Sequence, residues 1–319
     1  MFVVSEEIVK EIMTQELAYD AIKGAFITSY QARGEIFPVV IAKGCDKGNI
    51  FSIKSGNLFD QRLSGLKMGS YWSKNTLRGL PNHNTTIILL DEETGRTHAI
   101  INGGYLNGLR TAAANAVATD YLARREATVL GVLGAGHQSI FEIKAICQIR
   151  NIKRILINSR QQETAERAVR LLADDGIQAE VSTTEQVCRQ ADILVTVTSA
   201  TAPLFQADWI RPGTHISAMG ADQSGKQELP IELISCAALY ADLPAQSRKI
   251  GEFESASLLT PELKITAIGA VLSGDDRGRR SSDEITIFDS SGIALQDLSI
   301  AKMVLDTAIS RGLVNQVKF

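Results

Sequence analysis

A glycine-rich turn in the middle of the chain constrains the fold more than any other feature. It spans residues 134–139 and approximates GxGxxG/A, with Ser139 as the small third residue. A short apolar run, residues 128–133, precedes it, and residues 140–149 follow with apolar side chains at helical spacing. A second strand-like run covers residues 154–158. This order of strand, glycine turn, helix and strand predicts a βαβ unit that binds a dinucleotide.

The alternation continues towards the C-terminus, with an expected helix at residues 162–172. Further strands are expected at residues 178–182, 192–198, 215–219, 237–241 and 285–289. Residues 192–198 are almost continuously apolar, which is typical of a strand inside a parallel sheet. The pattern predicts an α/β fold with a Rossmann-type doubly wound parallel sheet.

The first 110 residues have a different pattern, with one or two helices in residues 5–32 followed by strand-like segments. The segments at 85–90 and 97–101 flank a turn and predict a hairpin. An Ala-rich helix is expected at 111–124, and a final helix at 298–310 is expected to pack back on this first part. We therefore expect an α+β domain of residues 1–115 plus 296–319, with the Rossmann domain, residues 116–295, inserted into it.

Composition and charge exclude several classes of protein. The chain has 33 Lys and Arg against 36 Asp and Glu, a net charge of −3, whereas nucleic-acid binders usually carry a basic excess. The longest uncharged run, residues 193–207, is shorter than the roughly 20 residues of a membrane span. The N-terminus is acidic where a signal peptide is basic, so we expect a cytoplasmic protein. The scattered cysteines and histidines lack metal-ligand spacing, and no metal is expected.

The end of the second strand bears on the choice of cofactor. NAD sites usually carry an acidic residue there, whereas NADP sites supply Arg. This chain has Asn158, Ser159 and Arg160, which favours NADP(H), although Asn158 can still hydrogen-bond a ribose. NAD and NADP both stay open. The alternative for the glycine turn is a tight loop that binds no ligand. The alternative for Arg160 is a solvated side chain that contacts no cofactor.

Five segments carry a resemblance to a known family: residues 65–69, 108–114, 130–138, 219–229 and 287–297. The chain resembles the ornithine cyclodeaminase/μ-crystallin family of NAD(P)-dependent imine and amino-acid oxidoreductases. Because these segments are spread along the sequence, the resemblance covers nearly the whole chain. The resemblance implies a homodimer, and it implies that the α+β domain binds substrate and forms the dimer.

The resemblance also implies residue roles. Lys67 and Arg110 match the family's contacts to the substrate carboxylate, and Asp222 matches its acid/base residue. We expect Asp222 and Lys67 to be catalytic. The expected cofactor contacts, which include the strand tip discussed above, are Thr85, Arg110, Thr111, Gly134, Ala135, Gly136, His137, Gln138, Asn158, Ser159, Arg160, Thr198, Met219, Asp222, Lys226 and Ser290.

Physical chemistry agrees with these roles. If Arg110 begins the Ala-rich helix, the helix N-terminus and the guanidinium both favour an anion there. A carboxyl group beside the reacting carbon–nitrogen bond stabilises an iminium and handles its proton. Each residue also has a plain alternative: Lys67 as a solvated strand residue, Asp222 as a turn cap, and Arg110 paired with Asp120 or Glu126.

Departures from the family pattern bear on the substrate. Ornithine-cyclising members carry a Glu where this chain has Ser52, with Lys54 two residues on and therefore on the same strand face. A Lys repels an ammonium tail and attracts a carboxylate, and Val39 stands where an Arg often follows Pro38. Ornithine is therefore a poor fit, and Ser52, Lys54, Lys67 and Arg110 are the expected substrate contacts.

The segments 52–56, 69–72 and 79–83 resemble the iminosuccinate-reductase branch of the family. Our leading hypothesis is an NAD(P)H-dependent reductase of a small anionic imine, with iminosuccinate reduced to L-aspartate as the best guess. The alternatives are a cyclic ketimine reductase acting on pyrroline or piperideine carboxylate, an ornithine cyclodeaminase, a relative said to act in ectoine utilisation, and a non-catalytic μ-crystallin-like binding protein.

Overall fold

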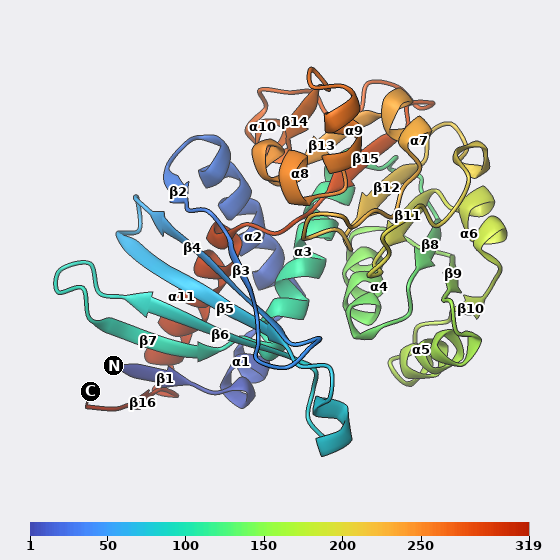
Figure 1. Cartoon of the computed structure of the whole chain (residues 1–319). Helices are drawn as coiled ribbons and strands as arrows, with labels where there is room; N and C mark the ends of the chain where they lie inside the picture. The colour runs from blue at the N-terminus through green and yellow to red at the C-terminus, as the bar shows by residue number, and fades with distance from the viewer. Residues whose placement is uncertain (319) are drawn as a thin grey trace. The chain divides into compact units, whose positions relative to one another are not determined.

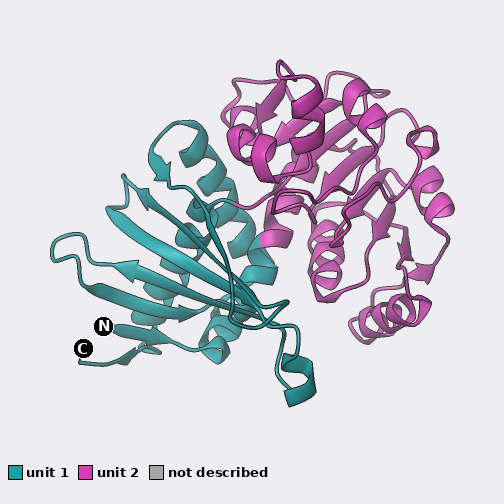
Figure 2. Ribbon diagram, in the orientation of Figure 1, with its two compact units in different colours: residues 1–110, 293–319 teal, residues 111–292 magenta. Residues whose placement is uncertain are grey.

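The computed structural model describes residues 1–318, which form two compact units. Unit 1 is residues 1–110 with 293–318, and unit 2 is Thr111–Gly292 (Figure 2). The junctions lie five and three residues before the expected ones. Helix α3 (Gly104–Leu122) begins in unit 1 and ends in unit 2.

Unit 1 is an eight-stranded, mainly antiparallel sheet covered by helices on one face (Figure 1). The strand order is β16-β1-β7-β6-β5-β4-β2, with β3 also paired to β4, and the expected hairpin is β6–β7. Helix α11 packs on β4, β5 and α2. The elements are β1 (Phe2–Val4), α1 (Glu6–Ile12), α2 (Gln15–Tyr30), β2 (Gly34–Ile36), β3 (Val40–Lys43), β4 (Ile50–Leu58), β5 (Leu63–Tyr71), η1 (Asn75–Arg78), β6 (His83–Leu90), β7 (Thr97–Asn102), α11 (Ala294–Ser310) and β16 (Asn315–Gln316).

Two facing glycines let α11 lie close against the sheet. Gly56 on β4 pairs with Gly65 on β5. A Cβ on Gly65 would lie 2.8 Å from a Leu298 methyl carbon and 2.5 Å from the Ile88 carbonyl oxygen, so a larger residue would push the helix away. The expectation that α11 begins at residue 298 is wrong. It begins at Ala294, and its first turn, which contains Asp297, therefore lies over the centre of the sheet.

Unit 2 is an eight-stranded sheet in which every neighbouring pair is parallel, as the sequence predicts. The order is β10-β9-β8-β11-β12-β15-β13-β14, so the strand order reverses between β8 and β11, where such sheets bind ligands. The elements after α3 are β8 (Val129–Leu133), α4 (His137–Ile149), β9 (Arg154–Asn158), α5 (Gln162–Asp174), β10 (Glu180–Val181), α6 (Thr184–Gln190), β11 (Ile193–Thr196), η2 (Ala207–Trp209), β12 (His215–Ala218), α7 (Ile231–Cys236), β13 (Ala238–Ala241), α8 (Pro244–Ile250), α9 (Glu254–Leu259), β14 (Ile265–Ala267), α10 (Ile268–Ser273) and β15 (Thr286–Asp289).

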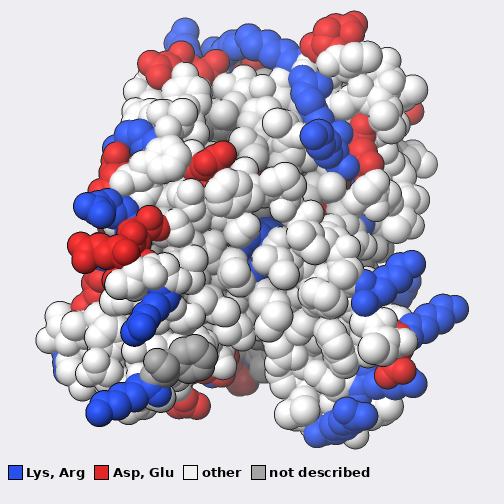
Figure 3. Space-filling model, turned by 60° about the vertical axis from the view of Figure 1, so that its left-hand side comes forward, with Lys and Arg blue, Asp and Glu red and all other residues white. Residues whose placement is uncertain are grey.

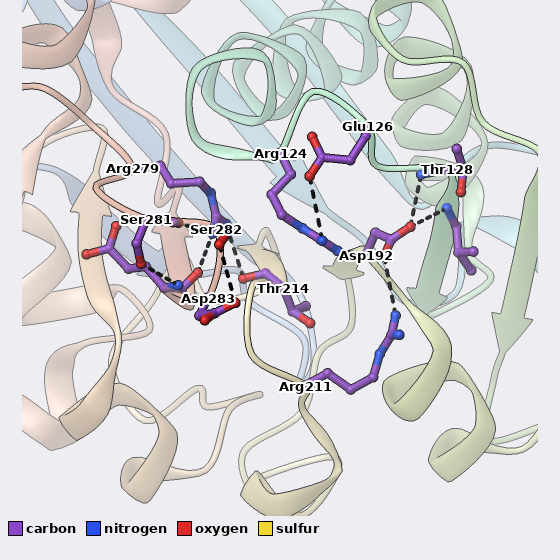
Figure 4. Close-up of polar contacts among 12 residues, drawn as sticks. Arg124, Glu126, Thr128, Asp192, Arg211, Thr214, Arg279, Ser281, Ser282 and Asp283 are labelled. Carbon is purple, nitrogen blue, oxygen red and sulfur yellow. Dashed lines mark hydrogen bonds and ion pairs between the residues drawn. The ribbon is translucent and has the colours of Figure 1, made fainter.

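A half-buried carboxylate, that of Asp192, stabilises the amino-terminal edge of this parallel sheet (Figure 4). Asp192 accepts hydrogen bonds from the backbone N–H groups of Thr128 and Val129 at 2.9 and 3.0 Å. Arg124 and Arg211 lie 2.9 and 3.3 Å from its other oxygen. The protein's own groups therefore occupy this edge, and the carboxyl ends of the strands are the edge that carries the expected site residues.

Charged side chains of both signs are spread over the face drawn in Figure 3. Within residues 1–318, none of the helices combines the length and apolarity needed to cross a lipid bilayer.

We predict that Gly134→Ala destabilises the chain. Gly134 has a φ of +114°, and an added Cβ would lie 2.5 Å from the Val197 carbonyl oxygen. The backbone strain alone should cost about 1–3 kcal/mol. Gly136→Ala is the matched control, because nothing lies within 4 Å of its Cβ position. Thermal unfolding should show a lower melting temperature for the first variant alone, and equal melting temperatures would contradict the prediction.

Candidate functional site

The predicted substrate residues of unit 1 converge on the covered face of its sheet. Lys54 on β4 and Lys67 on β5 are direct cross-strand partners, and both are buried. Arg110 on α3 is buried as well. Lys67 is therefore not the solvated strand residue of the plain alternative. Ser52 lies two residues before Lys54 on the same strand and is half-buried.

Asp297, in the first turn of α11, lies between two of these cations. Its carboxylate oxygens are 3.0 and 2.9 Å from the Lys67 Nζ, and Oδ1 is 3.2 Å from the Arg110 Nε. Burial opposes ionisation of Asp297, but Lys67 and Arg110 outweigh burial and hold its pKa below the usual range. We name Lys54, Lys67, Arg110 and Asp297 the cation cluster.

The cation cluster places the titration of Lys67 in the physiological range. Burial, and then the adjacent Arg110, lower its pKa to about 7, with Lys54 acting in the same direction and Asp297 opposing it. Lys67 can therefore bind an anion as an ammonium group below this pH and give up its proton above it.

The expectation that Arg110 begins a helix is wrong, and so is the alternative that it pairs with Asp120 or Glu126. Helix α3 begins at Gly104, so Arg110 lies in its second turn and gains nothing from the helix N-terminus. Its acidic partner is Asp297, whereas Asp120 pairs with Arg150 at 2.5 Å and Glu126 lies 3.7 Å from Arg124. Asn107 lies one turn earlier and accepts hydrogen bonds from Arg110 at 2.9 Å and from Lys67 at 3.2 Å.

The glycine turn of unit 2 has the shape that a pyrophosphate requires. Gly134 follows β8 in a conformation that glycine alone adopts readily, and Gly136 is the N-cap of α4, with no side chain capping the helix. A Cβ added to Gly136 would lie in open space, so a ligand can approach the backbone there. The Ser139 hydroxyl donates to the Gly136 carbonyl at 2.6 Å and closes the turn. Ala135 lies within this turn, and His137 and Gln138 begin α4.

The tip of β9 lies beside this turn in the sheet, because β8 and β9 are parallel neighbours. Asn158 donates to the Ser182 carbonyl at 2.7 Å and accepts from the Thr184 hydroxyl at 3.0 Å, so it holds the segment after β10. Ser159 is half-buried and Arg160 is exposed.

Asp222 lies in the loop after β12, at the carboxyl end of the sheet. Its Oδ1 accepts a hydrogen bond from the Lys226 Nζ at 2.6 Å, and Lys226 also donates to the Gly220 carbonyl at 3.1 Å. The Asp222 side chain is 57% exposed, so it is open to a ligand. Lys226, which the sequence marked for the cofactor, therefore orients Asp222.

Sequence reasoning missed the residue that supports this loop. Glu228 is fully buried and accepts hydrogen bonds from Thr196 Oγ1 at 2.7 Å, Thr198 N at 2.6 Å and Gly220 N at 2.9 Å. It also accepts from the hydroxyl of Thr198 at 2.7 Å. Burial raises its pKa, and these donors oppose the rise. The carboxylate thus ties together the ends of β11 and β12, next to the expected contacts Thr198 and Met219.

A second buried carboxylate supports Ser290. Asp242 accepts from the Ser290 hydroxyl at 3.3 Å and from the Gly292 N–H at 2.6 Å. The remaining expected cofactor residues are Thr85, half-buried on β6 of unit 1, and Thr111, half-buried on α3 at the start of unit 2. Among residues 1–318, His, Cys, Asp and Glu form no group of three or more that could hold a metal ion.

Several known enzymes are similar to this chain over its whole length. The iminosuccinate reductase of Paracoccus denitrificans is 37% identical over 320 residues, with complete coverage of both chains. Its crystal structure in complex with NAD⁺ has a TM-score of 0.93 and covers 100% of this chain and 99% of that one, at 36% identity. An archaeal alanine dehydrogenase dimer with bound NAD has a TM-score of 0.93 at 32% identity, with coverage of 100% and 99%.

The Thermococcus litoralis Δ1-pyrroline-2-carboxylate reductase, in complex with NADH and L-proline, has a TM-score of 0.92 at 25% identity and covers 99% of this chain and 100% of that one. The profile of the family described as "Ornithine cyclodeaminase/mu-crystallin family" matches residues 1–312. The chain therefore belongs to the ornithine cyclodeaminase/mu-crystallin family.

Proposed function

We propose that this nicotinamide-dependent oxidoreductase reduces a small anionic imine to an amino acid, with iminosuccinate to L-aspartate as the preferred reaction. One observation carries the choice of substrate: the cation cluster holds three buried cations and one buried carboxylate. With Lys67 protonated, its net charge is +2.

Because these cations are buried, they select strongly for the charge of the substrate. A buried ammonium or guanidinium group favours a bound anion, because an ion pair offsets part of its lost hydration. A dicarboxylate such as iminosuccinate brings two anionic groups to these cations, whereas a monocarboxylate brings one. The L-ornithine side chain would bring a further positive charge, which Lys54 repels.

The proposed roles follow from this assignment. Lys67 and Arg110 bind the carboxylate next to the imine carbon, and Lys54, with Ser52 beside it, binds the distal carboxylate. The nicotinamide supplies the hydride. Asp222, oriented by Lys226, holds the proton that the imine nitrogen requires. In the free enzyme, Lys67 exchanges its proton near neutral pH, which supports a catalytic role for it as well.

The cofactor is held by the glycine turn and α4, and the β9 tip distinguishes NAD from NADP. Arg160 and the lack of an acid in residues 158–160 support NADP(H), whereas the NAD(H) complexes of the three similar structures support NAD(H). We propose that both are accepted. We also propose a homodimer, supported by the dimeric alanine dehydrogenase and by exposed Val40, Ile41 and Met68 on the sheet of unit 1.

The L-proline complex of the pyrroline carboxylate reductase supports a second candidate, cyclic ketimine reduction. We predict that oxaloacetate with ammonia, which generates iminosuccinate, outperforms Δ1-pyrroline-2-carboxylate by about tenfold or more in kcat/KM, the effect of one charged contact. Pyruvate with ammonia and L-ornithine complete the panel. Each substrate is assayed with NADH and NADPH, and the amino acid formed is identified. Rapid proline formation without aspartate would reverse the assignment, and no turnover with any of these substrates would favour a binding protein.

Lys54→Met tests the distal contact while keeping the apolar stem. We predict that KM for iminosuccinate rises about tenfold or more, because a lost charged contact costs roughly 1.5–3 kcal/mol. Because Lys54 lowers the pKa of Lys67, its removal leaves Lys67 more fully protonated, and KM for the monocarboxylate imine should stay the same or fall. Lys43→Met, at an exposed position on β3, is the control. Equal increases for both substrates would contradict the distal role.

Asp222→Asn tests the proton donor. We predict that kcat falls by about 10²–10⁴-fold, the usual contribution of general acid–base catalysis, while NADH affinity measured by fluorescence titration is preserved. Glu254→Gln, at the neighbouring carboxylate that holds the Ser224–Gly225 turn, is the control for disturbance of the loop. Undiminished imine reduction in Asp222→Asn would remove Asp222 from the mechanism.

A further inference from the structure

We propose that Asp297 is a positioning residue that fixes the ammonium group of Lys67 and the guanidinium of Arg110 at the spacing that receives the substrate carboxylate. This inference rests on the proposed function and adds to it a residue that does not itself touch the substrate. Asp297 acts from α11, an element 230 residues along the chain from Lys67.

The geometry is that of a carboxylate supporting two cations together. Both Asp297 oxygens lie within 3.0 Å of the Lys67 Nζ, and Oδ1 also lies 3.2 Å from the Arg110 Nε. The neighbouring Gln296 accepts hydrogen bonds from Arg110 Nη1 at 3.4 Å and from the Ile293 N–H at 3.2 Å. The first turn of α11 therefore holds the guanidinium through two side chains, Asp297 and Gln296, and the ammonium through both oxygens of Asp297.

The close approach of α11 makes this support rigid. The first turn of the helix cannot move away without opening the contact of Leu298 with Gly65, and it cannot move closer because the sheet backbone lies beneath. The side chain of Asp297 is 2% exposed, so water does not screen its interaction with either cation. A rigid, unscreened carboxylate is suited to setting the position of a charge.

The charges around Lys67 determine the sign of the effect. Lys54 faces it from β4, Arg110 from α3 and Asp297 from α11, with the neutral Asn107 and Gln296 beside them. Asp297 opposes the two cations that lower the pKa of Lys67. Without it, that pKa falls further below about 7, and Lys67 loses its proton at a lower pH.

Asp297→Asn keeps the shape of the side chain and removes its charge. Lys67 can then shed its proton, so no pair of buried cations is forced on the fold. At acidic pH, where Lys67 is protonated in both enzymes, we expect KM for L-aspartate, measured in the oxidative direction, to be similar in the variant and the wild type. As pH rises through 7 the variant's KM should exceed that of the wild type increasingly, because its Lys67 loses the proton first. For a fall in pKa of one unit, the ratio of the two KM values levels off at about tenfold above pH 7, with kcat changed much less.

Comparing the two enzymes at the same pH cancels the ionisation of the amino acid itself. Asp306→Asn is the matched control, because Asp306 lies on the same helix but pairs with Lys302 at the surface. Asp297→Glu retains the charge and displaces it by one methylene. It should leave the pH dependence of KM as it is in the wild type, while raising KM at every pH. NADH binding and the melting temperature, recorded for every variant, identify those that do not fold.

A KM ratio for Asp297→Asn that is independent of pH would overturn the proposal, because a purely structural role predicts that result. A wild-type KM in Asp297→Glu would overturn it too, and this variant decides the matter if Asp297→Asn does not fold. Titration of the Lys67 ammonium by NMR, with and without L-aspartate as the probe, requires no turnover. If no imine is reduced, the proposed function fails, while a Lys67 pKa unchanged by Asp297→Asn would defeat the positioning role separately.

Discussion

The ion pairs of Asp297 with Lys67 and Arg110 are the interactions on which the substrate-binding part of the chain depends. Two cations on neighbouring elements, both away from water, repel each other and each lose hydration. A carboxylate between them makes the arrangement tolerable. That carboxylate must arrive from a third element that lies close to the sheet, and the small residues Gly56 and Gly65 permit this approach. The pairing of the two cations therefore depends on the position of α11, and that position depends on the glycines in the sheet.

Unit 2 uses buried carboxylates in a related way, with backbone N–H groups and hydroxyls as partners. Glu228 collects donors from the ends of β11 and β12, and Asp242 collects donors from the segment after β15. Each holds a loop at the carboxyl edge of the sheet, where the expected cofactor contacts lie. At the opposite edge, Asp192 likewise accepts hydrogen bonds from backbone N–H groups, those of Thr128 and Val129. Acidic residues thus set the backbone at both edges, while few of them are expected to meet a ligand.

The sequence predicted what depends on local pattern. The doubly wound sheet, the glycine turn and the shared face of Ser52 and Lys54 all follow from periodicities of a few residues. The start of α3 did not, because Gly103, Gly104 and Gly108 weaken the helix signal and packing overrides propensity there. The sequence did not predict the partner of Lys67 either. Asp297 was visible as part of a motif, but its role depends on a helix that begins four residues earlier than its pattern suggested and on contacts across 230 residues.

Unit 1 is assembled from both ends of the chain. Strand β1 pairs with β16, which follows α11. Helix α11 packs on β4 and β5, and these strands lie within the first 102 residues. During synthesis, Lys67 and Arg110 are made long before the carboxylate that neutralises them, and unit 2 is complete before α11 exists. Since domains fold as units while the chain emerges, unit 2 can fold first. The binding face for the anion is finished only when α11 has left the ribosome, because until then Lys67 and Arg110 lack the carboxylate that pairs with both in the folded unit.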